Sequence, residues 1–352
     1  MTRAGGTGSP PPRQPGRRSL SITVALVDRS AALGSRPSYS LDTVVGSRSH
    51  EARRLRGGRS STIRWYLFGI AVVLIAVGIG IGVATAGGNQ THRTMIVVAH
   101  QDDNLLFMLP DEFQDFSPGS AVETVYLTAG DAGRGSAFWH MRERAALAAT
   151  AALAHAKDSW VQSRLPIDGH QITMDTLVGD RRVVSIFFRL PDGNENGLGW
   201  PTDANQSLEK LWKGQIPTIR SVDGTEDYSR SGLVSALLAL MNRFQPKVIR
   251  TQDYDGYYGD SDHSDHITTA FLTRAAADRY RAPHTLLAYQ GYPDERLPPN
   301  VSNGNLTRKF HVFVSYASKM GGTVCNSFRQ CEASPLWRKL LRRQYLVASE
   351  TS

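Results

Sequence analysis

The stretch "TMIVVAHQDDN", residues 94 to 104, joins an apolar run to a cluster of titratable side chains. The apolar run is typical of a buried parallel strand. His100, Asp102 and Asp103 follow it at once, although burying such groups costs free energy and neighbouring carboxylates repel each other. A positively charged group should therefore lie close to them, and the end of this strand is the first place to look for a functional site.

Strands and helices are expected to alternate after this stretch. Apolar runs of strand length recur, and between them lie segments whose apolar residues have helical spacing. The strands are expected at 121–130, 181–191, 246–253 and 284–292, and the helices at 136–156, 207–215, 228–244 and 263–280. This alternation predicts an α/β fold with a mainly parallel, Rossmann-like sheet flanked by helices.

A second polar cluster, "DYDGYYGDSDHSDH" at 253–266, follows another predicted strand. Ligands of open α/β sheets bind at the carboxyl ends of the strands, so the two clusters should meet there across a shared metal ion. Catalytic zinc commonly takes three His or carboxylate ligands and leaves one position for water. The chain has only two cysteines, so these ligands must be His and Asp. The alternative, a calcium loop, is disfavoured because the segment lacks the EF-hand spacing.

Both clusters resemble the motifs of one enzyme family. "AHQDDN" resembles the A-H-P-D-D-E motif, and "HSDH" the H-x-D-H motif, of the PIG-L/LmbE-like zinc de-N-acetylases. The resemblance extends to "LTAGDAGRG", "RERAALAA" and "RLPDG", and covers roughly residues 94 to 290. It implies a hydrolase that removes the acetyl group from an N-acetylated amino sugar, with an N-acetylglucosamine-type glycoconjugate as the expected substrate.

The resemblance also implies a role for each matching residue. His100, Asp103 and His266 would bind one zinc ion per chain, and Asp102 would be the general base that activates the water. His263 would stabilise the oxyanion or protonate the leaving amine, and Asp265 would hold a neighbouring histidine in its productive state. The chemistry agrees, because zinc lowers the pKa of water and a nearby carboxylate can then take its proton.

Two residues depart from the family motif. Gln101 replaces the proline, and Asn104 replaces the glutamate, which removes a charge. Two other functions therefore stay open: a membrane-tethered sugar-binding protein with impaired catalysis, or a zinc amidase acting on non-sugar amides. The retained Asp102 argues against the binding protein.

Candidate substrate-binding residues are fewer and less specific. The resemblance places Arg142 near the substrate, although a surface helix pair with Glu143 is the alternative. Tyr257 and Tyr258 could line a sugar site by stacking, or could serve only in packing.

The first 93 residues predict a membrane anchor. Residues 1–64 hold twelve arginines against three acidic residues, which accounts for the chain's net charge of +8 and makes the rest nearly neutral. This composition predicts a disordered cytoplasmic tail and argues against a nucleic-acid partner. Residues 65–86 carry no charge over 22 positions and predict a transmembrane signal anchor, with cleavage after Ala86 or a buried core helix as alternatives.

The positive-inside rule then places the later residues outside the cytoplasm, as a linker at 87–93 and a catalytic domain at 94–347. Cys325 and Cys331 are close enough in sequence to form a disulfide in such an oxidising compartment. The segment 334–345 predicts an amphipathic helix packed through Trp337, Leu340 and Leu341. The oligomeric state is not predicted.

Overall fold

The central sheet has eight strands in the order β10-β9-β8-β1-β2-β5-β4-β3 in the computed structural model, which describes residues 92 to 352. The inner strands from β9 to β5 are parallel, and β10, β4 and β3 extend the sheet through antiparallel pairs. The bounds are β1 Arg93–Val98, β2 Ala121–Thr128, β3 Trp160–Ile167, β4 His170–Leu177, β5 Val183–Leu190, β8 Val248–Gln252, β9 Thr285–Tyr289 and β10 Leu346–Thr351. The predicted α/β fold with a mainly parallel sheet is confirmed.

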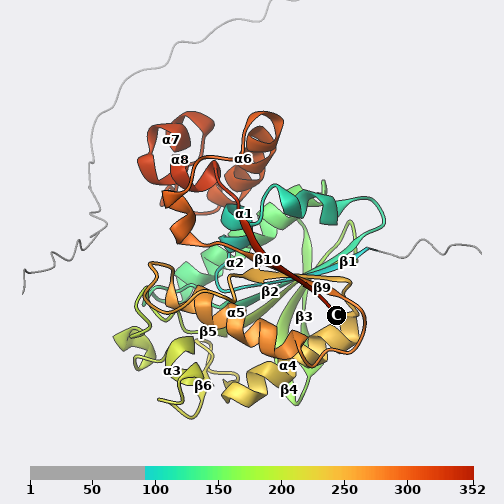
Figure 1. The fold of residues 1–352 in the computed structure, drawn as a ribbon, viewed down its shortest axis with the longest axis vertical. Helices are drawn as coiled ribbons and strands as arrows, with labels where there is room; N and C mark the ends of the chain where they lie inside the picture. The colour runs from blue at the N-terminus through green and yellow to red at the C-terminus, as the bar shows by residue number, and fades with distance from the viewer. Residues whose placement is uncertain (1–91) are drawn as a thin grey trace, which may run out of the picture. The chain divides into compact units, whose positions relative to one another are not determined.

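Helices cover both faces of this sheet (Figure 1). One face carries α3 Leu208–Trp212, α4 Arg230–Phe244 and α5 Ser264–Ala277, and the other carries α1 Asp103–Phe107, α2 Ser136–Leu153 and α6 Asn303–Ala317. Successive side chains of β1 point to opposite faces of the sheet, as in any strand. Met95 and Val97 pack on the α4–α5 side, and Ile96 and Val98 pack on the other side. A strand buried on both faces reads as a continuous apolar run, which is why the sequence reveals it.

Several local predictions agree with the structure. α4 begins after Ser229, whose hydroxyl accepts a hydrogen bond from the Gly232 amide at 3.0 Å, as an N-cap should. Cys325 and Cys331 are joined by a disulfide. The segment 334–345 contains the short helix α8 Pro335–Leu341, and its Leu340 and Leu341 are buried.

The hairpin of β3 and β4 and the C-terminal strand β10 were not predicted. β3 is mostly exposed at the edge of the sheet, so its side chains lack the apolar pattern of an inner strand. Short elements complete the described fold: η1 Asp111–Phe116, η2 Pro201–Asp203, η3 Tyr292–Arg296, β6 Ile219–Arg220, β7 Asp227–Tyr228 and α7 Phe328–Ala333.

Within residues 92–352, the hydrophobic clusters extend from Met95 to Ala348 and build a large core. The segment from residue 92 onward therefore supplies its own core and folds as a unit. The predicted tail, transmembrane segment and most of the linker lie outside the described residues. Between residues 92 and 352, no helix is long and apolar enough to cross a membrane.

Candidate active site

Two strand-to-helix junctions form the site at the carboxyl edge of the sheet. β1 leads through His100 into α1, and β8 leads through a longer loop into α5. β1 pairs with both β2 and β8, so the strand order reverses at β1, and crevices at such a switch point are where open α/β sheets bind ligands. Adjacent strands thus bring together two clusters that lie more than 150 residues apart, as the contact between His100 and His266 shows.

Three side chains point donor atoms at one another at this edge. His100 Nδ1 lies 3.2 Å from His266 Nε2. Asp103 reaches both rings, with Oδ1 at 3.1 Å from His266 Nε2 and Oδ2 at 3.4 Å from His100 Nδ1. Zinc–nitrogen bonds of about 2.0–2.1 Å in a tetrahedron place neighbouring ligand atoms about 3.3 Å apart. The three predicted ligands therefore have the spacing that a single divalent ion requires.

Neighbouring carboxylates orient both histidines. His266 Nδ1 lies 2.8 Å from Asp262 Oδ1, which fixes its proton on that side and leaves Nε2 free for a metal ion. His100 Nε2 is buried without a hydrogen bond among the described residues, and lies 3.4 Å from Asp265 Oδ2. Asp265 is held in turn by the Gly193 amide at 2.7 Å. This carboxylate–histidine arrangement is typical of metal ligands.

The electrostatics of the three residues favour a cation between them. Burial alone would lower the pKa of His266, but Asp103 and Asp262 outweigh it and raise the pKa to about 10. Burial also opposes ionisation of Asp103, yet His266 and His100 hold the pKa of its carboxyl well below the ordinary value. These buried side chains therefore favour positive charge at the site. Bound protons can supply that charge, and so can a metal ion that replaces them.

Asp102 lies beside this set without belonging to it. Its side chain is partly exposed and forms an ion pair with Arg142 of α2. Glu143 does not pair with Arg142, because it accepts two hydrogen bonds from Arg189, at 2.7 and 2.9 Å. Arg142 is therefore brought to the predicted base itself.

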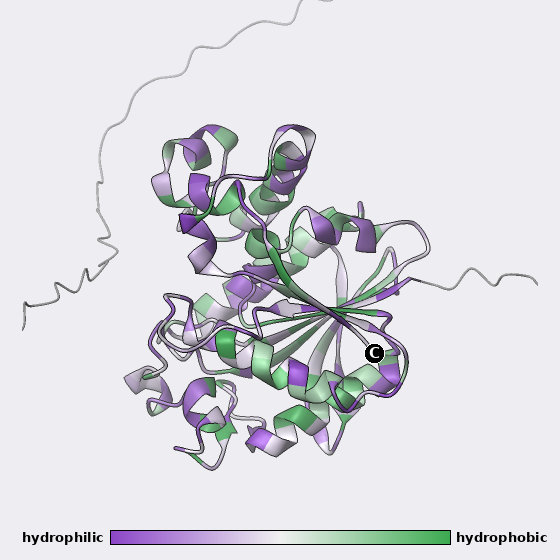
Figure 2. Ribbon diagram, in the orientation of Figure 1, coloured by the Kyte–Doolittle hydropathy of each residue, from purple (hydrophilic) through white to green (hydrophobic). Residues whose placement is uncertain are grey.

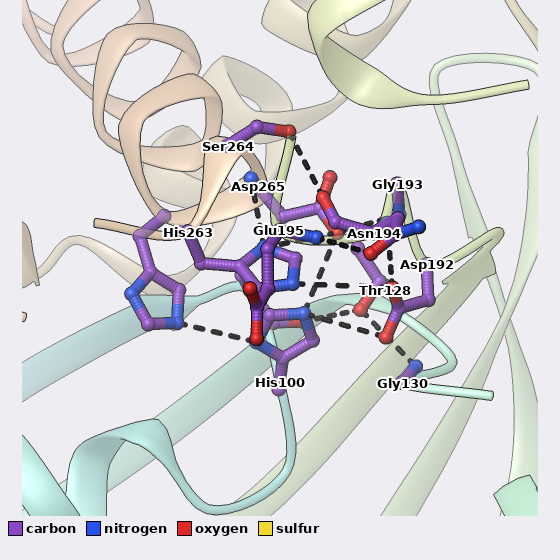
Figure 3. A network of polar contacts seen from close by, with 12 residues as sticks. His100, Thr128, Gly130, Asp192, Gly193, Asn194, Glu195, His263, Ser264 and Asp265 are labelled. Atoms are coloured by element: carbon purple, nitrogen blue, oxygen red, sulfur yellow. Dashed lines mark hydrogen bonds and ion pairs between the residues drawn. The ribbon is translucent and has the colours of Figure 1, made fainter. Parts of the chain in front are cut away.

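His263 and Asp192 close the other side of His100 (Figure 3). The His263 ring is 4.6 Å from that of His100, and its Nδ1 accepts the Asp265 amide at 3.2 Å. Burial and the charge of His100 lower the pKa of His263 to about 4. Asp192 Oδ1 lies 4.0 Å from His263 Nε2, the ring nitrogen that carries the proton in this arrangement.

Sequence reasoning missed three residues of this site. Asp192 follows β5 at the same edge, within the quoted "RLPDG", and Asp262 precedes His266 by one helical turn. Tyr292 stacks on His266 with ring centroids 5.3 Å apart. The available signals were the position of Asp192 directly after a predicted strand and that of Tyr292 at the last residue of another.

The two predicted sugar-stacking tyrosines are not brought to the three ligands. Tyr257 is largely exposed, and Tyr258 shares a hydrogen bond of 2.9 Å with Thr268. No hydrogen bond, ion pair or ring contact within residues 92–352 joins either tyrosine to His100, Asp103 or His266. Tyr258 instead carries Lys213 over its ring at 4.3 Å.

The residues that depart from the family motif are also buried and bonded. Gln101 Nε2 donates to the Thr128 carbonyl at 2.8 Å, which ties the β1 junction to β2. Asn104 Nδ2 donates to Glu112 at 2.8 Å. A carboxyl group therefore lies beside position 104 even though residue 104 has none.

The fold and these donors define a metal-dependent hydrolase site in an α/β domain. Residues 95–277 match the family model described as PIG-L, GlcNAc-PI de-N-acetylase. The chain belongs to the PIG-L family, and is a metal-dependent N-deacetylase. A comparison with curated protein sequences finds no significant match.

Solved structures with a similar fold include two deacetylases and one hydratase. The zinc-inhibited form of the teicoplanin deacetylase Orf2 is 16% identical, with 65% of this chain and 85% of that chain covered and a TM-score of 0.37. The N,N'-diacetylchitobiose deacetylase from Pyrococcus horikoshii is 13% identical, with 75% and 84% covered and a TM-score of 0.40. GalB, a 4-carboxy-2-hydroxymuconate hydratase from Pseudomonas putida, is 15% identical, with 72% and 84% covered and a TM-score of 0.39. Scores this low carry no argument about the reaction.

Proposed function

We propose that the protein uses zinc to hydrolyse the acetamido group of an N-acetylated amino sugar of the N-acetylglucosamine type. The observation that supports this most directly is the buried set of His100 Nδ1, His266 Nε2 and the Asp103 carboxylate. The two nitrogens lie 3.2 Å apart, Asp103 Oδ1 lies 3.1 Å from His266 Nε2, and Asp103 Oδ2 lies 3.4 Å from His100 Nδ1. Two neutral imidazoles and one carboxylate are a catalytic zinc donor set. A zinc ion bound there would polarise the amide carbonyl and lower the pKa of the attacking water.

Asp102 is the proposed general base. It precedes the ligand Asp103 directly, but its side chain turns to Arg142 and remains partly exposed. A carboxylate free of the metal and open to solvent can take the proton of the attacking water. Arg142 would hold that carboxylate in place.

His263 is the proposed hydrogen-bond donor to the developing oxyanion. Because its Nδ1 accepts the Asp265 amide, the neutral ring carries its proton on Nε2. A neutral donor fixed before the reaction stabilises an oxyanion without reorganisation. Asp265 has two roles in this proposal, since its amide sets the tautomer of His263 and its carboxylate faces His100.

The substrate class rests on the family model and on its printed description, GlcNAc-PI de-N-acetylase. The chain is also proposed to be a single-pass membrane protein with an extracytoplasmic domain. The disulfide between Cys325 and Cys331 supports export, because such bonds persist in oxidising compartments.

The test is acetate release from a panel of N-acetylated sugars and non-sugar amides by residues 90–352. We expect release from N-acetylglucosamine compounds, loss with a chelator and recovery with added zinc. Hydrolysis confined to non-sugar amides would replace the substrate proposal with a zinc amidase. Sugar binding without release in the zinc-loaded protein would make it a binding protein and overturn the proposed function.

A further inference from the structure

The C-terminal helices concentrate positive charge in a domain whose total charge is nearly zero. Residues 328–345, which contain α7 and α8, hold five arginines and lysines and one acidic residue, Glu332. Some of this charge is compensated, since Arg342 pairs with Glu332 at 2.7 Å and Lys339 pairs with Glu295 at 3.2 Å. The excess remains on the surface, because exposed Arg329 and Arg338 have no ion-pair partner among residues 92–352.

These charges surround a cavity. Its volume is about 440 Å³. The lining residues are Pro299, Glu332, Arg338, Lys339, Arg342 and Arg343. Four of the six are basic and one, Glu332, is acidic and paired with Arg342, so the lining keeps an excess of positive charge that suits an anionic group such as a phosphate.

Two large apolar side chains of the same two helices are also exposed. Phe328 of α7 is 49% exposed and Leu336 of α8 is 48% exposed. Figure 2 shows hydrophilic and hydrophobic residues side by side on these helices. A short surface that offers both free arginines and exposed Phe or Leu side chains has the composition of an interfacial membrane-binding segment.

We propose that the α7–α8 face (Phe328, Arg329, Leu336 and Arg338) docks on a membrane surface rich in anionic phospholipid. The basic residues would attract the phosphate headgroups, at about 1 kcal/mol for each Lys or Arg near such a surface. Phe328 and Leu336 would enter the boundary between headgroups and acyl chains. A soluble polyanion would use the charges alone and leave these apolar side chains in water.

The α7–α8 face is fixed relative to the candidate active site. Lys309 of α6 is fully buried and donates to the carbonyls of Leu106 in α1, at 2.6 Å, and Arg343, at 2.7 Å. α8 also packs on η3, which begins with Tyr292, and this ring stacks on His266. Docking would therefore hold the site at a set position beside the membrane and favour substrates presented there.

The test uses residues 90–352, which lack the predicted anchor, and measures sedimentation with vesicles. One set of vesicles is phosphatidylcholine, and the other is an equal mixture of phosphatidylcholine and phosphatidylglycerol. We expect binding to the mixed vesicles that weakens as salt rises, and little binding to phosphatidylcholine. The double variant Arg329→Gln/Arg338→Gln removes both free charges. Its partition coefficient between water and mixed vesicles should be about thirtyfold lower than that of the wild type.

Matched controls separate docking from general charge and from folding. Arg279→Gln/Arg281→Gln removes the same charge from exposed residues beyond α5 and should leave binding unchanged. Leu336→Ser should weaken binding severalfold, whereas Val161→Ser, at an exposed residue of β3, should not. The thermal unfolding midpoint of every variant should match that of the wild type.

Three results would overturn the proposal. One is equal binding of the Arg329/Arg338 variant and the wild type. Another is equal binding to both kinds of vesicle. The third is displacement from mixed vesicles by inorganic phosphate at constant ionic strength, because that would make the cavity a site for free phosphate.

Discussion

Two buried polar clusters lie beside β1. In one the protein's own side chains pair every charge, and in the other they leave room for a metal ion. The Arg250 cluster joins Arg250 of β8, 1% exposed, to Asp115 of η1, 0% exposed. Arg250 Nε donates to Asp115 at 2.6 Å, and Thr94 Oγ1 donates to the same carboxylate at 2.8 Å. The ligand cluster, His100, Asp103 and His266, instead turns donor atoms with free electron pairs toward one another.

The difference separates a structural cluster from a functional one. Arg250 and Asp115 compensate each other's charge, so nothing further is required for their burial. The ligand cluster buries two histidines with one carboxylate, and the pKa of His100 is raised well above the ordinary value because Asp103, Asp265 and Asp192 together outweigh the effect of burial. Its metal-facing atoms, His100 Nδ1, His266 Nε2 and the Asp103 carboxylate, face one another, and a metal ion can bind between them.

The largest effect is expected at the proposed base. Asp102→Asn removes the proton acceptor while leaving the three ligands in place, so turnover should fall about a hundredfold to ten-thousandfold. Metal content, measured by elemental analysis, should not change. Asp255→Asn, at an exposed aspartate, is the matched control and should keep its turnover. Full turnover of Asp102→Asn would remove Asp102 from the mechanism.

A substitution in the Arg250 cluster should lower the free energy of unfolding and leave metal binding unchanged. Asp115→Ala leaves Arg250 buried without its partner, so the free energy of unfolding in urea should fall by about 3–5 kcal/mol. Asp227→Ala breaks an exposed pair with Arg220, and there the loss should stay below about 1 kcal/mol. Loss of metal from folded Asp115→Ala would contradict the division into two clusters.

Asp262 should tune the metal site without being a ligand. Asp262→Asn loses the charged acceptor for His266 Nδ1, and such changes typically weaken metal affinity about tenfold to a hundredfold. Competition with a chelating dye measures this loss. Unchanged affinity would mean that Asp262 does not orient the ligand.

The most gradual effect, spread over several pH units, is expected at Glu112, where burial raises the pKa to about 8 from an ordinary 4.5. Between these values the folded chain keeps the proton and the unfolded chain releases it. Stability should therefore fall as pH rises through this range, by at most about 1.4 kcal/mol per unit, and level off above it. Glu112→Gln has no such proton and should give a flatter profile in urea unfolding. Parallel profiles would contradict the assignment.

The inner sheet and the place of the site were predictable for one physical reason, whereas the choice of His100, Asp103 and His266 as ligands came from the resemblance to the family motifs. Strands buried on both faces leave continuous apolar runs, and polar residues directly after such runs must lie at the carboxyl edge. The hairpin of β3 and β4 was missed because its exposed edge lacks that pattern. Asp192 and Tyr292 were missed because their places depend on how loops from β5 and β9 fold back over the site.

Metal stoichiometry tests the central claim most directly. Residues 90–352, purified, stripped with chelator and titrated with zinc, should bind about one ion per chain with high affinity. His100→Ala, Asp103→Ala and His266→Ala should each lose that site, while His263→Ala should keep it. Full binding by all three ligand variants, or none by the wild type, would contradict the account.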